Sequence, residues 1–327
     1  MATRVTFAIP TWNQAPYVAA AVRSALAQRL DGLEILISDD ASDDGTWEIV
    51  QDTVAGYRGP HAVRLNRNPR RLAGAHLNRV MELAGGEILV YAQGDDRWHP
   101  ERAARVAGMM DQLGAHMVTS NAVLLSPDGM ARGLMIAPAP APVQVTAAEI
   151  ATKGWTPRLS GATLAWRRSV FDHFGPLDPR LSPFGMDHIL PFRAAILGGL
   201  WHLPEALVGH RIHPGSATYM MLNKQASAME HGESTSAHTV TNLNYMLETV
   251  LEEIRRHGAT PELAALQRQV STAMLKATRH WIMQRNQLRL RGLRAYWSDN
   301  RPTDAAPKGD WHLEPAAPLN AVPAWLE

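Results

Sequence analysis

Between Val5 and Ser120, short apolar runs typical of β-strands alternate with segments of helical spacing. Strands and helices that alternate at this spacing form βαβ units, and the strands make a mostly parallel sheet. We therefore predict an α/β fold in which helices flank the sheet. The expected strands are Val5–Ile9, Leu33–Ile37, Ala62–Leu65, Ile88–Tyr91 and Met117–Ser120. The expected helices between them are Ala15–Ala27, Trp47–Val54, Gly74–Leu83 and Arg102–Leu113.

The fourth of these strands is followed by a glycine and two adjacent carboxylates, Gly94, Asp95 and Asp96. In an open α/β sheet, ligands bind just beyond the carboxyl ends of the strands. A carboxylate pair at that position can hold a divalent metal, and through it a diphosphate, because hard cations prefer oxygen ligands. The same residues equally allow a structural role, in which Asp95 and Asp96 cap the helix that follows Pro100.

A second polar loop, Ser38–Asp43, follows the second strand, and Pro10 stops the first. Both are expected at the edge that carries Asp95 and Asp96, because the carboxyl ends of parallel strands meet there. An acid in this loop can accept a hydrogen bond from the N–H of a base or from a ribose hydroxyl. By itself the loop favours an ordinary polar turn, since acids, serine and glycine are common turn residues.

The strand–helix alternation stops near Asn121, and this divides the chain. We predict a first domain over residues 1–217, made of the halves 1–121 and 122–217, with a turn at Ser126–Gly129 and a proline-rich connection at 137–143 in the second half. From about residue 218 only helical patterns follow, which predicts a helical extension over 218–298. The proline- and alanine-rich residues 299–327 are expected to form a loosely ordered tail.

Composition and missing motifs narrow the functional classes. The chain contains no cysteine, which excludes disulfides and thiolate metal sites, and its net charge of +1 gives no reason to expect a nucleic-acid partner. With no signal-peptide pattern and no apolar stretch of membrane-spanning length, we expect a cytoplasmic protein. No Gly-x-Gly-x-x-Gly follows the first strand and no Gly-Lys-Ser/Thr loop is present, which argues against a Rossmann dehydrogenase and a P-loop phosphotransferase.

Taken in order, five motifs within residues 3–216 resemble those of the family 2 inverting glycosyltransferases, enzymes of the GT-A fold that use nucleotide-sugar donors. Each motif is unspecific alone, and the resemblance rests on the ordered set. The motifs are Ile9–Asn13, Ser38–Ser42, Gly74–Asn78, Gln93–Asp96 with Trp98 and Pro100, and Gly185–Asp187 with the later His210–Ser216.

For the donor, the resemblance implies that Asp40 recognises the base while Pro10 and Thr11 frame the nucleoside. Asp95 would lie beside the ribose and the metal shell. The other implied contacts to the donor nucleotide are Asn13, Asp39 and Asn78. The first half, 1–121, would thus be the nucleotide-sugar-binding half, and 122–217 the acceptor half.

For the chemistry, the resemblance implies that Asp96 binds Mg²⁺ or Mn²⁺ directly and that His213 completes the metal site, with Asp95 as a possible further ligand. His210 is the alternative to His213. Asp187 would be the general base that deprotonates the acceptor hydroxyl. The structural alternative for Asp187 is a cap on its own helix.

The resemblance implies a metal-dependent transfer of one sugar from a nucleoside-diphosphate sugar to a hydroxyl acceptor, with inversion at the anomeric carbon. The nucleotide most common in the family is UDP. The acceptor would be a glycan or a lipid-linked glycan, in bacterial-type surface polysaccharide synthesis. The alternative is a GT-A-like module that binds a nucleotide sugar or glycan without catalysis. Only Gln93, which stands where family members often carry an acid, favours that alternative. The helical extension, with its basic stretch 263–298, is interpreted first as a plain helical appendage. The next interpretation is a homodimer contact through the apolar face Val240–Ile254, and the third is a peripheral membrane contact of the basic stretch.

Overall fold

The computed structural model describes residues 4–154, 156–179, 186–216, 218–219, 235–297, 317–319 and 321–326. The chain forms two compact units. The first consists of Met1–Arg211 together with Pro315–Glu327, and the second of Ile212–Glu314.

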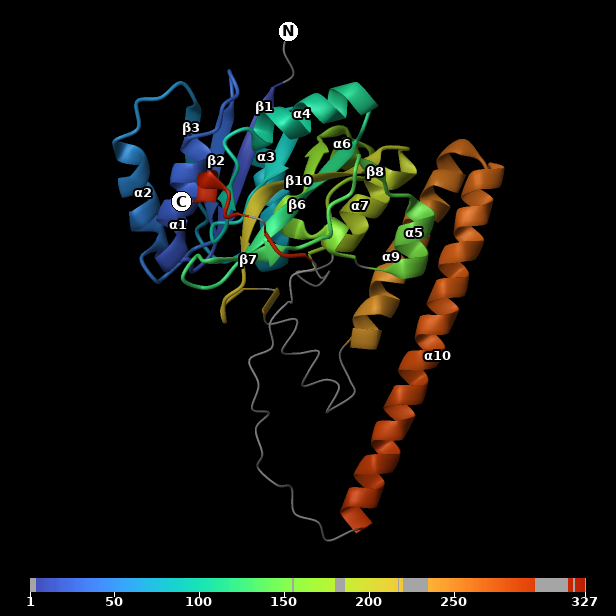
Figure 1. The fold of residues 1–327 in the computed structure, drawn as a ribbon. Coiled ribbons are helices and arrows are strands. Elements are labelled where there is room, and N and C mark those ends of the chain that lie inside the picture. Colours follow the sequence, from blue (N-terminus) through green and yellow to red (C-terminus); the bar gives the residue numbers. More distant parts are fainter. Residues whose placement is uncertain are drawn as a thin grey trace. The chain divides into compact units, whose positions relative to one another are not determined.

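The first unit is built on a ten-stranded sheet whose N-terminal half is parallel. In this half the strand order is β3-β2-β1-β4, and every pairing is parallel. These strands are β1 (Val5–Thr11), β2 (Glu34–Asp39), β3 (Ala62–Arg67) and β4 (Ile88–Tyr91). The elements between and after them are α1 (Ala15–Leu26), α2 (Thr46–Ala55), η1 (Ala73–Ala75), α3 (His76–Leu83) and α4 (Arg102–Leu113), and the helices flank the sheet (Figure 1). The predicted βαβ pattern is confirmed here.

The sheet continues through a mixed second half, in the order β9-β6-β10-β5. Strand β6 pairs in parallel with β10, whereas β9 lies antiparallel between β4 and β6. The new strands are β5 (Arg97–Trp98), β6 (Met117–Leu125), β7 (Ala131–Leu134), β8 (Val143–Gln144), β9 (Ala165–Arg167) and β10 (Leu200–Arg211). The helical elements of this half are α5 (Ala147–Lys153), η2 (Pro157–Leu159), η3 (Gly161–Thr163), α6 (Ser169–Phe174) and α7 (Met186–Ile196). The fold is therefore α/β as predicted, with antiparallel pairs concentrated in the second half.

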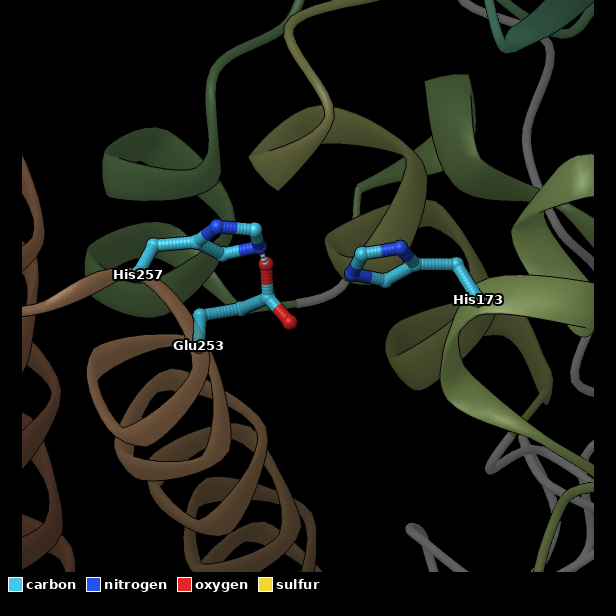
Figure 2. Close-up of side chains that lie close together, drawn as sticks. All are labelled: His173, Glu253 and His257. Carbon is cyan, nitrogen blue, oxygen red and sulfur yellow. Dashed lines mark ion pairs between the residues drawn. The ribbon is translucent and has the colours of Figure 1, made fainter.

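Among its described residues, the second unit contains the long helices α9 (Thr235–His257) and α10 (Pro261–Trp297), which pack against each other. Gly258 separates them with a φ of 79°, a left-handed conformation that favours glycine, and the Thr260 hydroxyl accepts the Leu263 N–H at the start of α10. Figure 2 shows Glu253 and His257 on successive turns of α9, with His257 Nε2 3.7 Å from Glu253 Oε2. Within the described part of the chain, no helix is both long and apolar enough to span a bilayer.

The described end of the C-terminal tail packs on the first unit. The Leu326 side chain is 4% exposed and contacts Val123 and Leu125 of β6. Ala317 forms an isolated β-bridge with Leu134 of β7, and the short turn η4 (Ala324–Leu326) ends the described chain. The proline- and alanine-rich composition predicts a loose tail. In the described part, the apolar side chains of Leu319, Trp325 and Leu326 and a few backbone hydrogen bonds hold the chain in place.

Candidate active site at the carboxyl edge of the sheet

Strands β1 and β2 bring the first polar motifs together. Thr11 and Asp39 occupy paired positions at the ends of these strands, and the Thr11 hydroxyl donates to Asp39 Oδ1 at 3.2 Å. The next residue, Asp40, donates its backbone N–H to the Thr11 carbonyl at 2.9 Å. Pro10, in register with Ser38, is buried within β1. The expected juxtaposition of these two loops at one edge is present.

Asp39 and Asp40 are both buried, and each already holds a loop. Asp39 accepts the Ser42 N–H at 3.0 Å and the Ser42 hydroxyl at 2.5 Å, which closes the turn after β2. Asp40 accepts the Asn68 side chain at 2.9 Å and two backbone N–H groups, those of Leu72 and Ala73, each at 2.8 Å. Because a carboxylate offers about four acceptor positions, Asp40 still has acceptor capacity for a base. Its role in base recognition stays a prediction.

The two asparagines make structural hydrogen bonds. Asn13, with a φ of 50°, pairs its side chain with Asp43 in both directions, at 2.8 and 3.1 Å. Asn78 likewise engages the backbone of Leu177 in both directions, at 2.7 and 3.0 Å. Donor contacts by Asn13 and Asn78 therefore stay predictions, and each would compete with a bond that already stabilises the fold.

Asp96 and His210 form the buried centre of the site. His210 Nδ1 lies 3.2 Å from Asp96 Oδ1, and the same oxygen accepts the Arg211 backbone N–H at 2.8 Å. Burial raises the pKa of Asp96, and His210 offsets this only in part. Burial acts to lower the pKa of His210, but the negative charges of Asp96, Asp95 and Asp187 outweigh it and raise that pKa. The pair is thus a carboxylate and an imidazole held together out of contact with water.

Asp187, at the start of α7, lies near this pair. Its Oδ1 approaches Gly161 so closely that a Cβ placed on that glycine would be 2.5 Å away. Its charge also reaches Tyr91: burial, followed by the charges of Asp187 and Asp95, raises the pKa of the Tyr91 hydroxyl. The structure therefore brings the predicted base to the edge that carries Asp95, Asp96 and His210.

His213 belongs to the second unit, which begins at Ile212. Its backbone N–H donates to the Ser216 hydroxyl at 3.3 Å, and its Nδ1 accepts the Gly215 N–H at 3.2 Å. Within the first unit, it is His210 that contacts Asp96. The preference for His213 over His210 stays a prediction.

Sequence reasoning missed two arginines that hold the acidic loop. Arg211 donates from Nε to the Asp95 carbonyl at 3.0 Å and from Nη1 to the Pro127 carbonyl at 2.8 Å. Arg102 is fully buried and donates from Nη2 to the Tyr91 carbonyl at 2.8 Å, at the strand end that precedes Asp95. A signal for Arg102 was available, because it shares a helix face with the apolar Val106 and Met110 at a spacing of four residues.

The donor chemistry of this edge fits a divalent cation. Asp95 and Asp96 supply carboxylate oxygens and His210 an imidazole nitrogen, a mixture that suits Mn²⁺ or Mg²⁺ better than a softer metal. The three side chains are buried, so a charge on the carboxylates costs less when a cation neutralises it.

Comparison with known proteins identifies the family and the fold of the chain. Residues 6–175 match the model of Glycosyl transferase family 2. The chain is 26% identical over 264 residues to an uncharacterized glycosyltransferase of Nostoc sp., covering 80% of this chain and 79% of that protein. It is 29% identical over 94 residues to the UDP-Glc:alpha-D-GlcNAc-diphosphoundecaprenol beta-1,3-glucosyltransferase WfaP of Escherichia coli, covering 29% of this chain and 36% of that relative.

Two solved structures show the same fold. S. aureus TarS, in complex with UDP-GlcNAc, superposes with a TM-score of 0.60 at 16% identity, over 86% of this chain and 79% of TarS. The mannosyltransferase PcManGT of Pyrobaculum calidifontis, in complex with GDP-Man and Mn²⁺, gives a TM-score of 0.50 at 19% identity, over 90% of this chain and 87% of that one. Since the family model spans about half of the chain and these neighbours have the same fold, the chain is a GT-A-fold glycosyltransferase and belongs to Glycosyl transferase family 2.

Proposed function

We propose that this glycosyltransferase transfers one sugar from a UDP-linked donor to a hydroxyl acceptor, with a divalent metal and with inversion at the anomeric carbon, in the assembly of a surface polysaccharide. The observation that carries the proposal is the buried contact of Asp96 with His210, beside Asp95 and Asp187, at the carboxyl edge of the sheet. This edge is where an α/β sheet binds its ligands.

In this proposal Asp96 and His210 hold the cation and Asp95 lies between it and the ribose. When bound, Mn²⁺ or Mg²⁺ neutralises the negative charge that develops on the departing nucleoside diphosphate. Arg211 fixes the backbone of Asp95 through its carbonyl, so the acidic loop keeps its shape when the donor binds. Burial of the pair strengthens these electrostatic interactions.

Asp187 is the proposed general base. Its carboxylate would accept the proton of the acceptor hydroxyl while that oxygen attacks the anomeric carbon from the face opposite the leaving diphosphate, which inverts the configuration. Gly161 makes room for this carboxylate, because a side chain at position 161 would occupy the space of Asp187 Oδ1. His210 and Tyr91, whose pKa values both respond to the Asp187 charge, are its neighbours.

The donor nucleotide and the acceptor are inferred from relatives. TarS was solved with UDP-GlcNAc, and the E. coli relative uses UDP-Glc and a diphosphoundecaprenol-linked acceptor. A succinoglycan biosynthesis protein, ExoO of Rhizobium meliloti, is 32% identical over 38% of this chain and 35% of its own length. These support a UDP-sugar and a glycan or lipid-linked glycan, whereas PcManGT keeps GDP as the competing nucleotide.

Calorimetry of UDP, GDP and dTDP, each with and without Mn²⁺, tests the donor site. We expect UDP to bind the wild type only with Mn²⁺, and Asp96→Ala to lose that binding because the buried ligand is gone. Asp52→Ala, an exposed acid on α2, is the matched control and should bind as the wild type does. If none of the nucleotides binds the wild type with metal, the proposed donor site is wrong.

A binding module without catalysis is the second candidate, favoured by Gln93, which stands where an acid is frequent in the family. Such a module would bind UDP and Mn²⁺ but would release no UDP from any UDP-sugar, whatever acceptor is offered. The binding module would be excluded if the wild type turns over a UDP-sugar and Asp187→Asn loses this turnover while it still binds the donor.

For the helical unit we propose contact with an anionic membrane surface through α10. The described face of this helix exposes Leu275, Ile282 and Met283, at 69%, 47% and 50%, among Arg268, Lys276 and Arg279. No acidic residue occurs between Leu263 and Ser298, so the charge of the face complements an anionic lipid surface. A plain appendage and a homodimer contact are the competing interpretations.

A further inference from the structure

The C-terminal segment 317–319 and 321–326, here called the C-terminal anchor, lies directly behind the Asp96–His210 pair. We propose that it is a positioning element of the active site, which sets the metal affinity of that pair without touching the metal or the substrate. This inference rests on the proposed metal-dependent function. It follows from three contacts within the first unit: two are made to the chain neighbours of Asp96 and His210, and the third to His99, three residues after Asp96.

The first contact holds β5, the strand that follows Asp96. Arg97, the residue after Asp96, donates from Nη1 to the Leu326 carbonyl at 2.5 Å. This bond is charge-assisted, and the arginine is part-buried, so it is stronger than a neutral hydrogen bond. The Arg97 side chain thereby links β5 to the last described turn of the chain.

The second contact holds the strand that carries His210. Gly209, the residue before His210, lies against Leu326: a Cβ at position 209 would be 2.6 Å from Leu326 Cδ2 and 3.0 Å from Leu125 Cδ1. Glycine is therefore required here for the close approach of the anchor. The buried Leu326 side chain fills this surface together with Val123.

The third contact is made to His99, two residues after Arg97. The Trp325 ring meets the His99 ring edge-on, with centroids 5.6 Å apart, and the His99 backbone N–H donates to the Leu207 carbonyl at 3.0 Å. At its other end, the anchor is fixed to β7 by the bond from the Leu134 N–H to the Ala317 carbonyl at 2.8 Å. The anchor is thus bound to the first unit at both of its ends, which restricts its movement along the sheet.

These contacts matter because the ladder that aligns the pair is very short. Strand β5 has 2 residues, Arg97 and Trp98, which pair with Gly209 and Val208 of β10. The next residues outward are Asp96 and His210, whose side chains are 3.2 Å apart. A ladder of two residues is marginal alone, so the anchor, packed on Arg97 and Gly209, supplies the rigidity that keeps both ligands in register.

The test compares Leu326→Asp with Val322→Asp in the full chain. Both add one carboxylate to the anchor, but Leu326 is 4% exposed and Val322 is 50% exposed. We expect Leu326→Asp to weaken Mn²⁺ binding, measured by electron paramagnetic resonance in the presence of UDP, by about tenfold or more, as supporting residues around metal ligands do. Val322→Asp should bind Mn²⁺ as the wild type does.

Milder variants keep the proposal testable if Leu326→Asp does not fold. Gly209→Ala should displace Leu326 and weaken Mn²⁺ binding, while Leu326→Met, which keeps volume and shape, should retain wild-type affinity. A melting temperature within a few degrees of wild type, together with weaker Mn²⁺ binding, separates positioning from general stability. Equal Mn²⁺ affinity in wild type, Leu326→Asp and Gly209→Ala would overturn the inference.

A readout without metal separates this inference from the proposed function. The imidazole NMR signals of His210 in the metal-free protein should shift in Leu326→Asp and stay in place in Val322→Asp. If the wild type binds no Mn²⁺, the proposed function fails, and a shift of the His210 signals still supports the anchor as the element that positions the pair. Unchanged His210 signals in Leu326→Asp would overturn the anchor's role even where Mn²⁺ binds.

Discussion

At the scale of single residues, Asp187 gives the sharpest prediction. Asp187→Asn keeps the size of the side chain and removes its basicity. We expect kcat for sugar transfer to fall by roughly 10²- to 10⁴-fold, while Mn²⁺-dependent UDP binding by calorimetry stays within a factor of about two. Asp172→Asn, an exposed acid on α6, is the control and should leave both quantities unchanged. Full activity in Asp187→Asn would remove Asp187 from the mechanism.

Gly161 tests the position of that base without altering its chemistry. A Cβ at Gly161 would lie 2.5 Å from Asp187 Oδ1, so Gly161→Ala must push the carboxylate aside. A shift of about 1 Å in a reacting group costs on the order of 100-fold in rate, and we expect a loss of kcat of that order.

The control for this change is Gly108→Ala, because a Cβ on Gly108 of α4 meets nothing within 4 Å. That variant should keep its activity and gain about 0.5–1 kcal/mol of stability from the helix preference of alanine. Wild-type kcat in Gly161→Ala would show that the carboxylate moves without consequence, and that its present position is not the catalytic one.

The residues of the site were partly predictable from the sequence. Asp40, Asp95 and Asp96 could be found because each follows a strand, and the ends of parallel strands meet at one edge. The contact of His210 with Asp96 could not be predicted, because it depends on the pairing of Gly209 with Arg97 in β5. A strand of 2 residues has no periodicity to detect, and the pairing of β10 with β6 also shifts register twice between Leu203 and Val208.

At the scale of elements, the parallel half of the sheet was predictable, whereas the strand pairing of the mixed half was not. Strands β1, β2 and β4 are buried along most of their length and stand out as short apolar runs with helices between them. Strand β9 has 3 residues and pairs antiparallel with β4 and β6, which are far from it in sequence. The place of β9 between β4 and β6 is decided by tertiary contacts alone, so the local sequence pattern could not predict it.

The pair of strands β6 and β10 carries a prediction about pH. His202 of β10 lies opposite Thr119 of β6, with 2.9 Å between His202 Nδ1 and the Thr119 hydroxyl. Burial, with a smaller effect from the charge of Arg158, lowers the pKa of His202 from 6.5 to about 4. Between these values the unfolded chain binds the proton and the folded protein does not, so His202 makes the fold less stable as the pH falls from about 6.5 towards 4.

We therefore expect the wild type to lose about 2–3 kcal/mol more stability than His202→Gln between pH 7 and about pH 4.5. Denaturant unfolding at the two pH values measures this difference, and His280→Gln, an exposed histidine on α10, should lose as much as the wild type. An identical pH dependence in wild type and His202→Gln would mean that His202 keeps the same pKa in the folded and unfolded states.

At the scale of the whole molecule, the two units present different surfaces to a partner. The first unit buries Asp95 and Asp96 at the carboxyl edge of its sheet, whereas α10 exposes Leu275 and Ile282 among basic side chains. Apolar side chains that insert between lipids, with cations beside them that attract anionic headgroups, bind a membrane surface more strongly than either alone. A lipid-linked acceptor would then be presented to an enzyme already at the surface that holds it.

We expect the wild type to sediment with vesicles of phosphatidylglycerol and phosphatidylcholine at low salt, and to be released at high salt because screening weakens the attraction. The Leu275→Glu/Ile282→Glu variant should stay in the supernatant. Gln269→Glu/Thr272→Glu adds the same two charges to exposed positions of α10 but keeps both apolar side chains, so it should retain more binding. If the two double variants bind the vesicles equally, charge alone attracts the helix to the membrane and the apolar side chains contribute nothing. If the wild type does not sediment, and forms a dimer that Leu275→Glu/Ile282→Glu dissociates in sedimentation equilibrium, the exposed face is instead a contact between two copies of the chain.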